Sequence, residues 1–176
     1  MCPAPGDERA FMVRRWIRDV GTLIVHVPRP GFEDAGIATR LQAAAAAGIR
    51  AWNGHPFPVR VERRAHEPAH FKVTWVRVLD GTAVGVARTR WSEREGLSVR
   101  SIDLATRNPH SPGEPIDPSR VRLTAAHEMG HALGLPHSDS ERDVMYPRNT
   151  ASSLTARDYR SMEALYQLPD GSRLAP

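Results

Sequence analysis

The sequence of 176 residues contains a single cysteine, Cys2, which excludes an internal disulfide and leaves the redox compartment undetermined. It also lacks the roughly 18 consecutive apolar residues that a membrane-spanning helix needs. The longest candidate, residues 41–49, is an alanine run interrupted by Gln42 and Gly48. The N-terminus has no apolar segment typical of a secretory signal, so either no signal exists or the sequence begins after its removal. We expect no membrane span.

Lysine is almost absent. Lys72 is the only lysine, so the formal charge of +4 and the pI of about 10.0 come from arginine. A basic balance can indicate a nucleic-acid partner. Here, however, the arginines are scattered and alternate with apolar residues, as in Val59-Arg60-Val61-Glu62, which is typical of solvated strand faces. We expect no nucleic-acid partner.

Length and composition favour one compact domain, because 40% of the residues are hydrophobic and can form a core. We expect residues 1–176 to form a single monomeric domain, with residues 1–15 and 169–176 as flexible ends. No internal repeat is visible.

The pattern of elements predicts an α+β fold. Residues 34–52 are rich in alanine and leucine and predict a long first helix. Asp117-Pro118 predicts the start of a second helix, whose apolar stripe ends at Gly134, and a last helix follows over about 155–165. Residues 108–114 are expected to form a loop. Short β-rich runs predict a sheet of four or five strands, at residues 22–27, 57–63, 71–79, 84–91 and 97–105.

The chemistry is concentrated in residues 127–137, which read HEMGHALGLPH. His127 and His131 are four residues apart, so they differ by only about 40° around a helix and can bind one ion. Gly134 can adopt the positive φ that a chain reversal needs, which brings His137 to the same ion. Three imidazoles on Zn²⁺ leave a fourth position for water, as in catalytic sites.

Glu128 lies about 100° round the helix from His127, beside the expected metal rather than bound to it. Its carboxylate can accept a proton from water that attacks a polarised carbonyl, and can then protonate the departing amine. The alternative, that these are ordinary helix histidines, is weakened because all five specified residues occur at the required spacing. The pattern predicts metal-assisted amide hydrolysis.

Residues 127–137 fit H-E-x-x-H-x-x-G-x-x-H and resemble the metzincin clan of zinc peptidases, within it the matrixin-like branch in a minimal form of bacterial type. Ser138 directly follows the third histidine, as in matrixins. Met145, in Val-Met-Tyr-Pro, resembles the Met-turn that underlies the zinc site in this clan. Leu154–Asp158, together with Leu165-Tyr166, resembles the C-terminal helix of matrixin catalytic domains. The specific likeness covers residues 120–168.

The resemblance implies a zincin-like twisted mixed sheet with a long first helix, an active-site helix and a C-terminal helix. It implies a zinc endopeptidase, acting outside the cytoplasm or in the cell envelope, that binds protein or peptide substrates in extended form. It places the substrate-binding edge strand at residues 97–105, for which a plain core strand is the alternative interpretation. Asp158 resembles the aspartate that holds the Met-turn, and it is equally consistent with an ordinary acid at a helix N-terminus.

The sequence also departs from the matrixin pattern. Arg157 occupies the position of the aspartate that pairs with the freed N-terminus in matrixins, and residues 147–149 lack the Pro-x-Tyr of the specificity pocket. Tyr146 follows Met145 too closely to resemble the zinc-binding tyrosine of astacins. No counterpart of the structural zinc and calcium loop is visible, and His66 and His70 are interpreted as surface residues. We therefore do not extend the activation contact or the pocket specificity of matrixins to this sequence.

Three alternatives stay open. Cys2 is expected to be a plain terminal thiol; a latency thiolate on zinc and a lipidated cysteine are the other interpretations. The protein is expected to be an active endopeptidase. The two alternative hypotheses are a catalytically silent zinc-stabilised binding module and a hydrolase of non-peptide amides.

Overall fold

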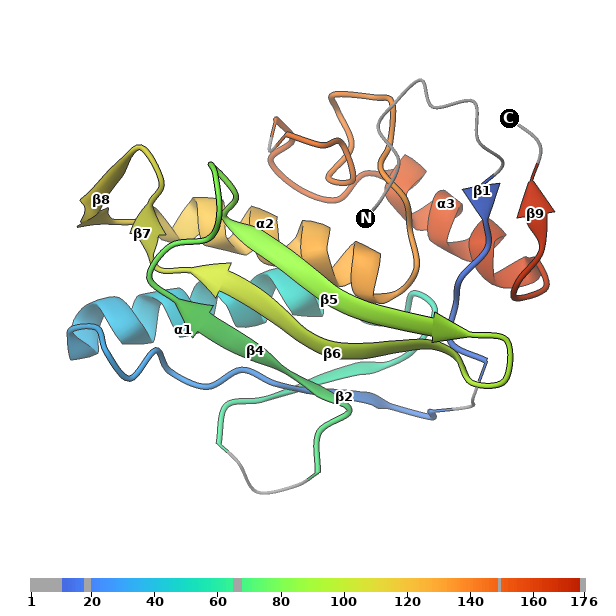
Figure 1. The fold of residues 1–176 in the computed structure, drawn as a ribbon, viewed down its shortest axis with the longest axis horizontal. Helices are drawn as coiled ribbons and strands as arrows, with labels where there is room; N and C mark the ends of the chain where they lie inside the picture. Colours follow the sequence, from blue (N-terminus) through green and yellow to red (C-terminus); the bar gives the residue numbers. More distant parts are fainter. Residues whose placement is uncertain (1–10, 18–19, 65–67, 149, 175–176) are drawn as a thin grey trace.

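A computed structural model describes residues 11–17, 20–64, 68–148 and 150–174 (Figure 1). Cys2, His66 and Asn149, which were singled out in the sequence, lie outside the described residues. The described part has a five-stranded sheet with helices against it, so the predicted α+β class is confirmed.

The main sheet is mixed, and its strand order is β3-β2-β4-β6-β5. The first four of these strands run parallel to their neighbours, and β5 is antiparallel to β6. The sheet therefore has the mixed character and the number of strands that were predicted. Its strands are β2 (Leu23–His26), β3 (Val59–Glu62), β4 (Phe71–Val76), β5 (Gly85–Ser92) and β6 (Gly96–Ala105).

The edge of the sheet beside the second helix is formed by β5, so the prediction that residues 97–105 form this edge is wrong. Strand β6 lies between β4 and β5, and its buried Leu97, Ile102 and Leu104 suit an interior position. Strand β5 carries the exposed run Arg88–Arg90. Charged residues are common on edge strands because they discourage further pairing.

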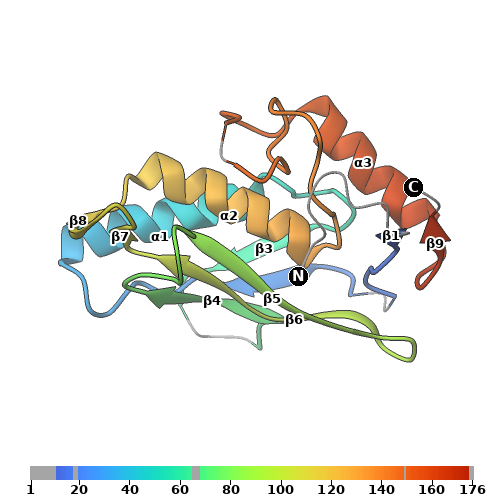
Figure 2. The same cartoon turned by 45° about the horizontal axis from the view of Figure 1, so that its top comes forward.

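Helices α1 (Ala35–Arg50) and α2 (Pro118–Ala132) lie side by side on one face of the sheet (Figures 1 and 2). Asp34 caps α1 through hydrogen bonds from Gly36 N and Ile37 N, and Asp117 caps α2 through one from Ser119 N. Helix α3 (Ala156–Gln167) lies beyond the end of α2 in both views. The three predicted helices are confirmed.

Two expectations about irregular segments need correction. The segment expected to be a loop contains a short hairpin of β7 (Arg107–Asn108) and β8 (Ser111–Pro115), whose register is irregular. The proline and glycine residues of this segment suggested a loop and concealed the hairpin. The chain ends are also partly paired, because β1 (Phe11–Met12) pairs with β9 (Arg173–Leu174). Val13 N donates to Ser172 O at 2.8 Å. Residues 11–13 and 172–174, which lie in the segments expected to be flexible, are thus hydrogen-bonded to each other.

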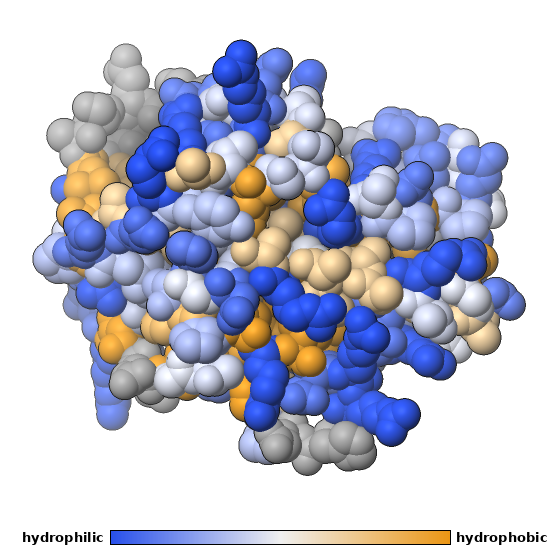
Figure 3. Space-filling view, turned by 180° about the vertical axis from the view of Figure 1, so that it is seen from behind, coloured by the Kyte–Doolittle hydropathy of each residue, from blue (hydrophilic) through white to orange (hydrophobic). Residues whose placement is uncertain are grey.

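Within the described ranges, none of the helices combines the length and the apolar character that crossing a bilayer requires. On the face opposite to that of Figure 1, hydrophilic side chains are intermixed with small apolar patches (Figure 3).

Helices α1 and α2 approach each other closely at Gly48. A Cβ atom added there would lie 2.1 Å from the carbonyl oxygen of Arg122 and 2.9 Å from the nitrogen of Ala126. One turn further on, the fully buried Trp52 donates its indole N–H to Ala126 O at 2.8 Å. Helix α2 is thus fixed against α1 along the turn that precedes the first histidine.

We predict that Gly48→Ala destabilises the protein by about 1–3 kcal/mol, because a backbone carbonyl cannot move aside as a side chain can. Alanine alone would stabilise a helix by about 1 kcal/mol relative to glycine, so the sign of the change is decisive. Gly31→Ala is the control, since nothing lies within 4 Å of its added Cβ. Equal unfolding temperatures of the two variants would contradict the close approach.

Candidate active site

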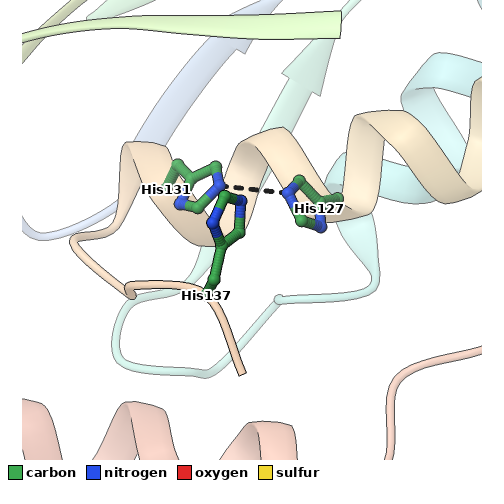
Figure 4. Close-up of side chains that lie close together, drawn as sticks. All are labelled: His127, His131 and His137. Carbon is green, nitrogen blue, oxygen red and sulfur yellow. Dashed lines mark hydrogen bonds between the residues drawn. The ribbon is translucent and has the colours of Figure 1, made fainter. Parts of the chain in front are cut away.

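The two helical histidines point their Nε2 atoms at each other across one face of α2 (Figure 4). The Nδ1 of His127 lies 2.7 Å from Val144 O, and the Nδ1 of His131 lies 2.8 Å from Leu135 O. A carbonyl oxygen only accepts, so in both rings Nδ1 carries the proton. The Nε2 atoms, 3.0 Å apart, therefore present their lone pairs toward a common point.

The third histidine reaches the same point because the chain reverses at Gly134. Helix α2 ends there with a φ of +108° at Gly134, and Leu135 N donates back to Gly130 O at 2.9 Å. His137 then lies on the returning segment, opposite the helix (Figure 4). One nitrogen from each of the three rings lies within 4.8 Å of the others. The structure thus brings the three predicted ligands together.

Burial sets the protonation of these rings. Desolvation lowers the pKa of His127 and His137, and it lowers the pKa of His131 to about 3, helped by the neighbouring His127. All three imidazoles are therefore neutral at pH 7. Three neutral imidazoles are a donor set that fits Zn²⁺. In two of them the second ring nitrogen is held by a backbone carbonyl, as is usual for metal-binding histidines.

Glu128 faces the edge strand of the sheet. Its side chain is buried, and Oε2 accepts a hydrogen bond of 2.7 Å from Ala87 N on β5. Burial raises the pKa of Glu128 to about 7, an effect that the Ala87 N–H partly opposes. The close contact depends on Gly85, where an added Cβ would lie 2.8 Å from Cγ of Glu128. The carboxyl group is therefore held in place by the backbone of β5.

A turn packs beneath the two helical histidines. Met145 is 3% exposed, and its sulfur would lie 2.2 Å from a Cβ added at Gly130, which sits between the histidines on α2. The carboxylate of Asp158 accepts from Val144 N at 3.2 Å and from Met145 N at 3.3 Å. Since Val144 O orients His127, Asp158 positions the ring of His127 through this turn.

Asp158 performs both of the roles considered from the sequence. Besides holding the turn, it completes a capping box at the start of α3, where its carboxylate accepts from Thr155 N and the Thr155 hydroxyl accepts from Asp158 N. Its neighbour Arg157 instead pairs with Asp139 at 2.6 Å and with Asp143 at 3.5 Å. Arg157 thereby ties the loop after His137 to α3.

The free carbonyls at the end of α2 are also satisfied. Trp16 donates its indole N–H to Ala132 O at 2.9 Å, and Tyr166 donates its hydroxyl to Leu133 O at 2.9 Å. The carbonyl oxygen of Arg14 lies only 2.1 Å from the position that a Cβ at Gly134 would take. Two segments far apart in the sequence thus fix the turn that delivers His137.

Several of these positioning groups were missed by sequence reasoning. Val144 O, Leu135 O and Ala87 N are backbone atoms, which any residue type supplies, so no sequence signal could have identified them. Trp16 and Tyr166 act through long-range contacts that local patterns do not reveal. Gly85 was the one detectable signal, as a glycine inside a predicted strand.

The histidines and Glu128 open into a groove of about 2530 Å³. Its walls come from β5, from α2 and from the segment after Met145, where Pro147 and Arg148 line it. Pockets for small ligands usually measure about 300–1,000 Å³. A groove of this size, bordered by an edge strand, suits an extended chain.

The model of the matrixin family matches residues 59–167 of this sequence, which include the three histidines, Glu128 and strand β5. The chain belongs to the matrixin family. Matrixins are zinc-dependent metalloproteases, so the family agrees with the donor set described above.

Two relatives show how far the similarity extends. Macrophage metalloelastase of Rattus norvegicus is 40% identical over 52 residues, which are 27% of this chain and 11% of that protein. Macrophage metalloelastase of Oryctolagus cuniculus is 40% identical over 60 residues, 31% of this chain and 13% of that protein. The chain thus matches only about an eighth of the length of these matrixins.

We predict that Gly134→Ala prevents His137 from reaching the metal centre. Alanine would be strained at the φ of +108° and would also clash with Arg14 O. Gly54→Ala is the matched control, because Gly54 has a φ of +85° and nothing within 4 Å of its added Cβ. Zinc content after dialysis should fall in Gly134→Ala only. Equal zinc content in both variants would show that the reversal is not needed.

Asp158→Asn should weaken zinc binding although Asp158 is not one of the three predicted ligands. An amide oxygen accepts less strongly than a carboxylate, so the turn that carries Val144 O loses support. Loss of such an outer partner typically lowers metal affinity about 10–100-fold. Competition with a fluorescent zinc chelator measures the zinc affinity. An unchanged affinity would show that Asp158 does not support the metal site.

Proposed function

We propose that this matrixin is a zinc-dependent endopeptidase in which His127, His131 and His137 hold the metal and Glu128 is the general base. The proposal rests on one observation above the others. Two Nε2 atoms, a third imidazole and an anchored carboxyl group open into the same groove. This combination serves hydrolysis better than it serves structure, because a structural zinc site is closed on all sides.

Bound Zn²⁺ would supply Lewis acidity, which acidifies water and polarises the carbonyl of the scissile bond. Glu128 accepts the proton of the attacking water, for which a pKa of about 7 is well matched. The same carboxyl group then returns the proton to the departing amine nitrogen. The Ala87 N–H keeps the carboxyl oriented throughout.

The substrate would lie along β5. An edge strand offers unpaired main-chain groups, and an extended peptide can add to it as a further strand. We interpret the turn at Met145 as the Met-turn of the clan, a packing element beneath the ligands. The size of the groove favours a polypeptide over a small amide.

Two further parts of the proposal concern the state of the protein. Matrixins generally act outside the cell, and we extend this to the present chain. We also propose that it is a monomer. Detection of the protein in the medium or cell envelope of its host, and light scattering of the purified chain, test these two points separately.

Replacing Glu128 with Gln should leave zinc binding intact and lower kcat/KM by at least about 100-fold, because general-base catalysis contributes that much or more. Glutamine keeps the shape and can still accept from Ala87 N. Cleavage of an unfolded protein and zinc content are measured on the same samples. A chelator should abolish wild-type cleavage, and added zinc should restore it.

Near-normal activity of Glu128→Gln would overturn the assigned role. Wild-type protein with one zinc that cleaves no member of a diverse peptide library would instead favour the catalytically silent binding module. Turnover of small amides without turnover of peptides would favour the third hypothesis.

A further inference from the structure

The charges that line the groove are unbalanced. Among its described lining residues, seven are arginines, and the only acidic residues are Asp80 and Glu128. The whole chain, by contrast, has 24 basic and 20 acidic residues. Arginine is therefore concentrated in the groove well beyond the average of the sequence.

Most of these arginines have no acidic partner among the described residues. Arg88 pairs with Asp103 at 3.0 Å. The remaining six form no ion pair with any residue in the part of the chain that the structure describes: Arg14, Arg90, Arg100, Arg120, Arg148 and Arg173. Outside the groove, Arg107 pairs with Glu33 and Arg157 with Asp139. Five of the six are exposed, and Arg120 is half-buried.

These arginines are distributed along the whole groove. Arg120 lies in the first turn of α2, and Arg14 lies beside Gly134 just beyond its last turn. At a rise of 1.5 Å per residue these ends are about 20 Å apart, the length of about six residues of an extended peptide. Arg148 lines the groove after Met145. A bound peptide would therefore meet arginines on both sides of Glu128.

We propose that the groove selects acidic peptide segments, with Asp or Glu on both sides of the bond that is cut. The part of this inference that concerns cleavage rests on the proposed peptidase function. Complementary charge raises the rate of encounter and suppresses basic partners, and salt screens it. A peptide is favoured over other polyanions because the groove also offers the edge of β5 and a carboxyl group at its centre.

The test uses three peptides that share one cleavable core and differ only in their flanks: Asp/Glu, the isosteric Asn/Gln, and Lys. The wild-type zinc protein should cleave the acidic peptide with a kcat/KM about tenfold above the neutral one, mainly through KM. The preference should shrink between about 0.05 and 0.5 M salt, as screening shortens the range of charge. Equal kcat/KM for all three peptides would overturn the inference and leave the peptidase intact.

Arg120→Gln and Arg148→Gln should each reduce the preference about two- to fivefold, the range for exposed ion pairs. Arg160→Gln is the matched control, since Arg160 is exposed on α3 and does not line the groove. Thermal melts verify that each variant is folded. Loss of preference in the control alone, or in none of the variants, would contradict the assignment.

Binding provides a readout that does not need turnover. Anisotropy of a labelled acidic peptide on zinc-loaded Glu128→Gln should show a Kd that rises when Arg120 and Arg148 are also replaced. If that binding holds while the wild type cleaves nothing, the groove inference stands and the peptidase falls. If a single-stranded DNA of equal charge displaces the peptide more effectively than unlabelled peptide does, the groove is a general polyanion site and the inference is overturned.

Discussion

Helix α2 is held at points where other parts of the chain come too close for a side chain. Gly48 admits the backbone of α2 from the side of α1, and Gly85 brings β5 against Glu128. On α2 itself, Gly130 makes room for the sulfur of Met145, and just beyond its end Gly134 admits Arg14 O. The contacts at Gly48 and Gly134 are with backbone carbonyls, which cannot relax as side chains do, so they fix the position of the helix. The site depends on this confinement.

The orientation of the site follows from the same contacts. Val144 O fixes the ring of His127 and Leu135 O fixes that of His131. The N–H of Ala87 fixes the carboxyl group of Glu128, and each of these three backbone groups comes from a different segment. Asp158 then ties the first of these segments to α3. The chemical groups are therefore aligned by the fold itself, with few side chains devoted to that purpose. A change in packing should be felt first as a change in metal affinity.

Local geometry explains why the sequence predicted so much. The spacing of His127 and His131 is a property of one helix, and the reversal at Gly134 is a property of one residue, so both can be inferred without knowing the fold. Strand order is different, because it depends on pairing between distant segments. The edge was therefore assigned to residues 97–105, although β5 forms it. The alternation of charge in Arg88–Arg90 was the clue that favoured β5.

The central claim, that three histidines from one helix and the following loop form a single zinc centre, is tested most directly by zinc X-ray absorption on the purified protein. The account predicts one zinc per chain with three imidazole nitrogens as ligands, and a loss of one of them in His137→Ala. A zinc content well below one per chain, or a spectrum that does not change in His137→Ala, would contradict it.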